Sequence, residues 1–468
     1  MSIQVENQMA FQGALRRDIV KQPYQGFVFP FFDRRTLLVF IDTLLVVLSV
    51  GGAILLWQPA PDLPSAISAI GAYWYWFPIM LGSWWALAWL NDLYDVPTSN
   101  RKVLSAVRVV SVGALLLGIY LALAYLKLST LSGVLALYFV LIALPSIALW
   151  RWLYAIVLNT PPFRHRVLVI GEDEQERFIA NALKRHPANY HVLGYADLPD
   201  LLRQRRIHEI VVASGTKPEL ESNLFQLLSD CRAEGMRVSQ MPDLYERLYH
   251  STPIPYIDSS WALGAVQDMP VFGILPTVMK RLLDVVLGLA GLTVFMLVLP
   301  VLALAIRLDS PGTIFYRQVR CGRAGKPFSI IKFRTMYSDA EKDGRPRWAT
   351  QHDDRITRVG RFLRKTRLDE VPQVINVLRG EMSVIGPRPE RPEFIKELQQ
   401  VIPFYRARLL AKPGLTGWAQ IHYPYGNTVE DALMKLQYDF YYLRHWSVWL
   451  DLYIVFRTFS VVFKFMGT

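Results

Sequence analysis

Residues 280–307 read KRLLDVVLGLAGLTVFMLVLPVLALAIR, an apolar run with basic residues at both ends. Its uncharged part is as long as the roughly 20 residues that cross a bilayer as a helix. Positive charge on both flanks disfavours translocation of either end, and Pro300 removes an amide donor and predicts a kink. The sequence therefore favours a re-entrant helical hairpin over about 282–307, bent at Pro300, rather than a helix that crosses the membrane completely.

The composition supports a membrane protein with an anionic partner. The chain has 468 residues, of which 52% are hydrophobic and 19% charged, and its formal net charge is +12. This length predicts two or three modules. A basic balance attracts nucleic acid, phospholipid head groups or phosphorylated substrates. Cys231 and Cys321 are the only cysteines, which disfavours a disulfide scaffold or a structural zinc site.

Upstream of this hairpin, four apolar stretches predict a transmembrane bundle over 36–151, at 36–57, 72–91, 109–126 and 128–150. The loop near 92–108 is basic, whereas 58–71 contains no Lys or Arg. The positive-inside rule then places the N-terminal arm, 1–35, and everything after residue 151 in the cytoplasm. The arm lacks a compact apolar core with a cleavage site behind it, so we expect no cleavable signal peptide.

Residues 164–250 alternate strand-like and helical patterns, which predicts a small Rossmann-like α/β domain with a parallel sheet. The first strand ends at Gly171, but Glu172, Asp173 and Glu174 follow in place of two further glycines. Acidic side chains there would repel a pyrophosphate. A structural or regulatory domain is therefore favoured over a working NAD site.

Downstream of the hairpin, the chain is basic and rich in motifs. Lys332 and Arg334 alternate on one face of a predicted strand, where they could grip a diphosphate, although a solvated basic face is the alternative. Asp369 and Glu370 follow four basic residues at 361–367. Cations would keep the carboxylates ionised, and an ionised Asp can attack phosphorus. A surface helix laced with salt bridges explains the spacing equally well.

Two further loops are rigid. Prolines on both sides hold the backbone around Arg388 in Gly386-Pro387-Arg388-Pro389, which suits a phosphate clamp. The loop at 412–417 contains two glycines and suits close approach of backbone to a ligand. An aromatic, basic tail ending near Lys464 predicts an amphipathic helix on the membrane surface.

Taken together, residues 277–468 resemble the bacterial sugar transferase family, the monotopic polyprenyl-phosphate phosphoglycosyl transferases. The matching blocks are Lys280-Arg281 with Asp284, the apolar hairpin, Lys332-Phe333-Arg334, 368–373, 386–389, 412–417, Asp439 and Asp451. With the four spans and the central domain, the chain is similar to the large members that initiate exopolysaccharide, capsule or O-antigen synthesis. A serine usually precedes the hairpin proline in this family, whereas Leu299 precedes Pro300 here.

The resemblance implies a fold, a site and a reaction. A C-terminal mixed α/β catalytic domain would use Asp369 to attack the β-phosphate of a UDP-sugar and expel UMP, and undecaprenyl phosphate would then take the sugar phosphate. Asp369 and Glu370 would hold Mg²⁺. The implied phosphate-binding residues are Lys332, Arg334, Arg364 and Arg388, and the implied supporting residues are Gln373, Asp439 and Asp451. The implied location is the bacterial inner membrane, with the soluble domains facing the cytoplasm.

Three other hypotheses compete with this one. A transferase that catalyses its reaction on the transmembrane bundle would need a buried acidic pair there, but the sequence offers only isolated Asp42 and interfacial Asp92 and Asp95. A membrane-bound regulator with an inactive C-terminal domain would be expected to lose Asp369, which this chain keeps. A nucleic-acid binder would explain the net charge, but the basic residues cluster around carboxylates and prolines, so we expect no nucleic-acid partner. The expected partners are UDP-sugar, undecaprenyl phosphate, membrane lipids and a second copy of the chain in a homodimer.

Overall fold

The computed structural model divides the chain into two compact units, Met1–Met241 and Pro242–Thr468. The residues that it describes are 33–58, 62–91, 93–94, 99, 101–126, 133–157, 165–171, 173–185, 190–193, 207–213, 228–233, 235–270, 273–337, 354–423, 426 and 428–463. The predictions for nearly all of the arm 1–35 and for the last residues of the tail, from Lys464 on, lie outside these residues.

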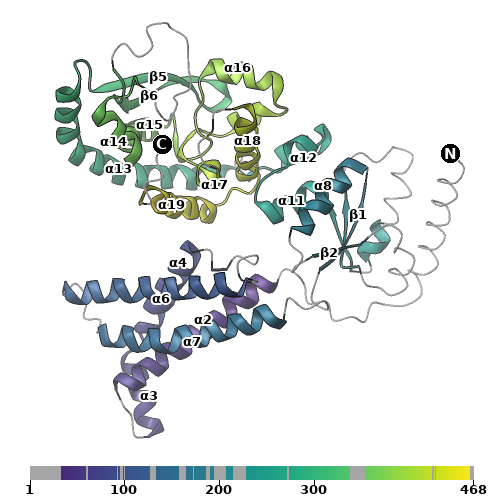
Figure 1. Cartoon of the computed structure of the whole chain (residues 1–468), viewed down its shortest axis with the longest axis vertical. Helices are drawn as coiled ribbons and strands as arrows, with labels where there is room; N and C mark the ends of the chain where they lie inside the picture. Colours follow the sequence, from purple (N-terminus) through teal and green to yellow (C-terminus); the bar gives the residue numbers. More distant parts are fainter. Residues whose placement is uncertain are drawn as a thin grey trace, which may run out of the picture. The chain divides into compact units, whose positions relative to one another are not determined.

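The first unit begins with a bundle of apolar helices (Figure 1), namely α2 (Asp33–Trp57), α3 (Leu63–Ala72), α4 (Trp76–Leu90), α6 (Lys102–Tyr125) and α7 (Gly133–Val157). The long helices α2, α6 and α7 are each long and apolar enough to cross a membrane. Large apolar side chains such as Phe40 and Leu48 are exposed on the outside of the bundle, as lipid contact requires.

The second predicted span, 72–91, differs from the structure. The stretch forms the end of α3 and then α4, which has only 15 residues. A helix of that length reaches about 22 Å, short of the roughly 30 Å of a bilayer core. Apolar composition alone does not reveal where a helix is interrupted, and the break at residues 73–75 shortens this one.

A buried ion pair joins two helices of the bundle. The Arg151 guanidinium on α7 donates to the Asp42 carboxylate on α2 at 2.6 Å, and both side chains are almost fully buried. Arg151 also donates to the carbonyl oxygen of Leu93 at 2.7 Å and to Ser99 Oγ at 3.1 Å. Asp42 therefore has a structural role, as the buried counter-ion of Arg151.

Replacing Asp42 by Leu should destabilise the protein by about 3–5 kcal/mol, because Arg151 would be left as a buried charge without its counter-ion. The free energy of unfolding in mixed detergent micelles measures this loss. The double variant D42L/R151L removes both charges and should recover much of the stability. Equal stability of D42L and the native protein would show that the pair contributes nothing.

The first unit also contains a four-stranded parallel sheet in the order β2-β1-β3-β4. Its strands are β1 (His165–Ile170), β2 (Tyr190–Leu193), β3 (Glu209–Val212) and β4 (Arg237–Gln240), and α8 (Asp173–Lys184) follows β1. A Cβ on Gly171 would stand 2.4 Å from the Cβ of Ala213. The glycine after β1 thus allows two strand ends to approach, which gives it a packing role that requires no bound nucleotide.

The second unit contains the remaining elements (Figure 1). These are α11 (Met241–Tyr249), η3 (Ile254–Tyr256), α12 (Ser259–Gln267), α13 (Ile274–Asp309), β5 (Phe315–Cys321), η5 (Arg323–Gly325), β6 (Pro327–Phe333), α14 (Arg358–Thr366), η6 (Leu368–Gln373), α15 (Val374–Arg379), β7 (Ser383–Ile385), α16 (Pro392–Val401), η7 (Tyr405–Leu410), β8 (Gly414–Thr416), α17 (Trp418–His422), α18 (Val429–Arg444) and α19 (Val448–Phe463). Strands β5 and β6 are antiparallel, and β7 and β8 are parallel. The mixed α/β architecture predicted for this region is confirmed.

Helix α13 has 36 residues with Pro300 inside it, and it bends along one side of the second unit in Figure 1. Near its start, Asp284 accepts hydrogen bonds from Ser383 Oγ at 2.7 Å and from the Val384 amide at 2.8 Å. At its end, Asp309 accepts from the Val359 amide at 3.0 Å. Both ends of this long apolar helix are therefore bonded to the same unit.

Candidate active site

A left-handed turn positions the two adjacent carboxylates. Helix α14 ends at Arg367, whose φ is 55°, and the chain turns there directly into η6. A Cβ on Gly360 would stand only 2.1 Å from the carbonyl oxygen of Thr335, so α14 lies against the backbone that follows β6. Asp369 and Glu370, in the first turn of η6, are each only 8% exposed.

Glu370 is held by two cations from different parts of the unit. Lys332 Nζ, on β6, lies 2.7 Å from Glu370 Oε1, and Arg388 Nη2 lies 2.6 Å from the same oxygen. Arg388 Nη1 is 3.3 Å from Oε2. Burial raises the pKa of Glu370, but Arg388 and Lys332 outweigh it and hold the pKa well below its usual range. Glu370 is therefore ionised at neutral pH.

Asp369 differs from its neighbour because its carboxylate makes no hydrogen bond or ion pair with any residue that the structure describes. Burial raises its pKa to about 6, while Lys332, Arg364 and Arg388 act in the opposite direction. At pH 7 most of the carboxylate is ionised. A buried, ionised carboxylate that makes no hydrogen bond or ion pair with a described residue and lies near three cations is suited to attack an electrophilic phosphorus.

The main chain around Arg388 is tightly packed. The Gly386 amide donates to the carbonyl oxygen of Thr416 at 2.9 Å, and the Gly414 amide donates to that of Pro387 at 2.8 Å. A Cβ on Gly414 would stand 2.1 Å from the Gly386 amide nitrogen. The glycines of the two predicted rigid loops therefore pack against each other, and this contact holds the backbone that carries Arg388.

Arg408 supports the same backbone, and sequence reasoning missed it. This buried residue donates through Nη2 to the carbonyl oxygen of Arg388 at 3.0 Å and to Asp439 Oδ2 at 3.0 Å. Its Nη1 donates to the Tyr405 hydroxyl at 2.7 Å. Asp439 is thus linked to the backbone of Arg388 through Arg408, and its supporting role stays a prediction. No local pattern marks Arg408, because its partner Asp439 is 31 residues away in sequence.

Two predicted residues lie elsewhere. The structure buries the Arg334 guanidinium against the end of α13, where it donates to the carbonyl oxygens of Ser310 and Pro311. Asp451 pairs with Lys280 at 2.7 Å and accepts from the Tyr442 hydroxyl at 2.8 Å. Neither side chain is bonded to Glu370. In this structure the Nη1 and Nη2 donors of Arg334 are bonded to backbone carbonyls and not to the contacts around Lys332, and the phosphate-binding role of Arg334 stays a prediction.

The other predicted residues keep positions compatible with a role. Arg364 is near enough to lower the pKa of Asp369, and its Nε donates to Thr335 Oγ1 at 3.0 Å. Gln373 is buried at the end of η6. Pro300 lies inside α13 and is exposed.

A magnesium ion could use the Asp369–Glu370 pair. Within the described ranges, no group of three or more His, Cys, Asp or Glu side chains converges on one point. Mg²⁺ is commonly bound by one or two carboxylates together with water and substrate phosphate oxygens, so two adjacent carboxylates fit this mode. The Asp369 carboxylate is open, whereas Glu370 would have to exchange a contact with Lys332 or Arg388 for the metal.

The fold and the site define a membrane protein whose second unit presents a buried carboxylate pair among basic side chains. Residues 275–465 match the family model described as bacterial sugar transferase. The chain belongs to this family, which confirms the resemblance seen in the sequence.

Three curated relatives are similar to this chain. It is 34% identical over 271 residues to the UDP-N-acetylgalactosamine-undecaprenyl-phosphate N-acetylgalactosaminephosphotransferase of Aeromonas hydrophila, covering 58% of this chain and 62% of that protein. It is 42% identical over 223 residues to the UDP-glucose:undecaprenyl-phosphate glucose-1-phosphate transferase of Escherichia coli, covering 47% and 46%. A protein of the same name from Caulobacter vibrioides is 43% identical over 217 residues, covering 42% and 80%. The matched part of the chain spans less than two thirds of the first two relatives.

Proposed function

We propose that this protein transfers a sugar-1-phosphate from a UDP-sugar to undecaprenyl phosphate, with Asp369 as the nucleophile. An Asp369 carboxylate oxygen attacks the β-phosphorus, the bond from that phosphorus to the oxygen of UMP breaks, and UMP leaves with both electrons. The resulting aspartyl-phosphosugar is attacked by an oxygen of undecaprenyl phosphate, which restores the free carboxylate and yields undecaprenyl-diphosphate sugar. The observation that carries this proposal is the buried Asp369 carboxylate, to which no described residue is hydrogen-bonded or ion-paired.

The surrounding residues support each step of the proposal. Lys332 and Arg388 meet at Glu370, so a diphosphate that displaces part of this contact would find two cations already in place. Arg364 adds a third positive charge near Asp369. In this role the cations bind the donor phosphates and stabilise the charge that develops on departing UMP. A magnesium ion held by Glu370 and Asp369 would neutralise phosphate oxygens in the same place.

Both ends of α13 are bonded to the second unit, through Asp284 and Asp309, and this supports the re-entrant hairpin as part of the proposal. A helix that returned to its starting face would keep the site beside the cytoplasmic surface of the bacterial inner membrane, where UDP-sugars and the lipid phosphate meet. The exposed Trp449 and Phe456 of α19 support its placement on that surface. The homodimer and the Rossmann-like character of 164–250 stay predictions.

The experiment that tests the reaction measures UMP from the purified full chain with Mg²⁺ and a panel of UDP-sugars. The donors named in the relatives, UDP-glucose and UDP-N-acetylgalactosamine, head the panel. With undecaprenyl phosphate one donor should turn over continuously. Without it, that donor should give a burst of no more than one UMP per site, since the covalent intermediate would accumulate. Continuous UMP release with undecaprenyl phosphate, together with no burst of UMP in its absence, would contradict the covalent route.

A further inference from the structure

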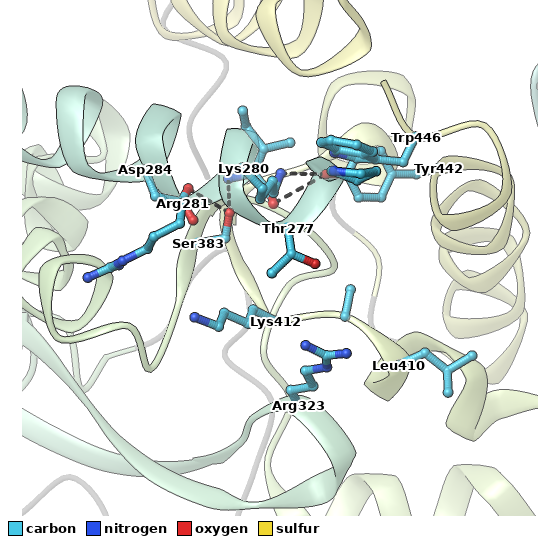
Figure 2. A pocket seen from close by; sticks show the side chains of 13 residues that line it. Thr277, Lys280, Arg281, Asp284, Arg323, Ser383, Leu410, Lys412, Tyr442 and Trp446 are labelled. Atoms are coloured by element: carbon cyan, nitrogen blue, oxygen red, sulfur yellow. Dashed lines mark hydrogen bonds between the residues drawn. The ribbon is translucent and has the colours of Figure 1, made fainter. Parts of the chain in front are cut away.

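A second basic cluster lies in a pocket that shares no residue with the Glu370 contacts. The pocket lies at the start of α13, and Figure 2 shows its lining, which includes Lys280, Arg281, Arg323 and Lys412. Arg281 donates to the carbonyl oxygens of Val377 and Leu378, at the end of α15 farther from η6. These carbonyls are four and five residues along α15 from Gln373, the last residue of η6.

The charges of this pocket are not balanced. Asp284 is the carboxylate that lines it, and the lining residue Lys280 pairs with Asp451, outside the lining, at 2.7 Å. Asp284 accepts from a hydroxyl and an amide on β7. Arg323 and Lys412 make no side-chain hydrogen bond or ion pair with any residue that the structure describes. The pocket therefore presents more positive than negative charge.

The cations also converge. The Lys412 Nζ and the Arg281 Nη1 lie 3.5 Å and 3.7 Å from the point where a Cβ on Gly380 would stand. Burial lowers the pKa of Lys412, and the neighbouring Arg281 and Arg323 lower it further, while Asp284 acts in the opposite direction. Lys412 and Arg281 repel each other, Asp284 offsets only part of the positive charge of the pocket, and an anion bound between the cations would relieve the repulsion.

Apolar groups surround the same position. Ile385, Leu410 and Trp446 line the pocket. On α13, Ile274 and Leu282 are exposed on either side of the pocket-lining Thr277 and Arg281, and α13 is apolar and long enough to cross a membrane. An anion that reaches this pocket is therefore met by cations and by a surface suited to acyl or prenyl chains.

We propose that Arg323 and Lys412 bind the phosphate group of a membrane lipid in this pocket, at a site distinct from the Asp369–Glu370 pair. Two unpaired cations supply the charge, and the apolar walls select a phosphate that carries a lipid tail over free phosphate. This inference does not rest on the proposed transferase reaction, because binding is measured without UDP-sugar and without turnover.

The test uses the full chain in uncharged detergent and the double variant R323Q/K412Q, with K396Q as a control that removes an exposed charge on α16. Native mass spectrometry would follow titrations with phosphatidylglycerol, undecaprenyl phosphate, phosphatidylcholine and inorganic phosphate. We expect R323Q/K412Q to bind one of the two anionic lipids at least about tenfold more weakly than the native chain. K396Q should bind as the native chain does, and K412R should retain most of the affinity.

Comparing the four titrations shows whether the pocket binds the phosphate of a lipid or free phosphate. The anionic lipid whose affinity falls more in R323Q/K412Q is the ligand. Any binding at Glu370 is the same in the native chain and in R323Q/K412Q, so it does not contribute to the difference between them. Equal affinity of the native chain and R323Q/K412Q for both anionic lipids would overturn the proposal. Native-chain affinity for inorganic phosphate equal to that for the lipids would also overturn it. An unchanged unfolding temperature of lipid-free R323Q/K412Q separates lost binding from lost folding.

Discussion

Replacing Asp369 by Asn is expected to lower UMP release from the preferred UDP-sugar by about 10³-fold or more, since removing a covalent nucleophile typically costs at least that much. The amide has nearly the same shape as the carboxylate but cannot form the acyl phosphate. Because no described residue is bonded to Asp369, the substitution breaks no native contact and folding should be preserved. Both the burst without acceptor and the steady-state rate with undecaprenyl phosphate should disappear together.

Two matched variants locate the effect. D268N removes an exposed carboxylate of the same unit at the end of α12 and should leave UMP release unchanged. E370Q should also lower the rate, and it should reduce stability as well, because Lys332 and Arg388 lose their common partner. A burst of native size from D369N would exclude Asp369 as the nucleophile.

Replacing Arg408 by Leu should have the largest effect on stability in the second unit, about 3–5 kcal/mol, because Asp439 would be left buried without its counter-ion. The free energy of unfolding in mixed detergent micelles measures this effect. R406L is the matched control, since Arg406 is an exposed arginine two residues earlier on η7. It should behave as the native chain does.

Arg408 is also expected to position Arg388, and a second variant tests this role. In R408L/D439L both buried charges are gone, so much of the stability should return. The hydrogen bond to the carbonyl oxygen of Arg388 is still missing, and kcat for UMP release should remain low. Full recovery of both stability and kcat in the double variant would show that Arg408 is purely structural.

The chemistry of the site was accessible from the sequence because its signals are local. Asp369 and Glu370 are adjacent, and basic residues precede them within one helical turn or two. Glycines and prolines likewise mark the loops around Arg388 and Lys412. Proline restricts the backbone φ angle and glycine widens the accessible range of backbone angles, whatever the surrounding sequence. Membrane spans were predictable for the same reason, although the length of α4 was not.

Pairing between distant residues was not accessible. Lys332 and Arg334 follow the same alternation along the strand, yet one contacts Glu370 and the other the end of α13. Asp439 and Asp451 are both buried aspartates in the tail, but one supports Arg388 through Arg408 and the other pairs with Lys280. Identical residue types receive different roles because the neighbouring element supplies the partner.

By itself, the sequence determined the family, the mixed α/β region after the apolar spans, and the carboxylate pair that suits phosphoryl transfer. Only the tertiary structure decided that Glu370 is paired with cations while Asp369 makes no such contact with a described residue. It also decided that Arg323 and Lys412 line the same pocket as Arg281. The reason is physical. Residue types and local periodicity set what a segment can form, whereas the strength of a charge depends on which other charges, tens of residues away in sequence, the fold places within a few ångströms of it.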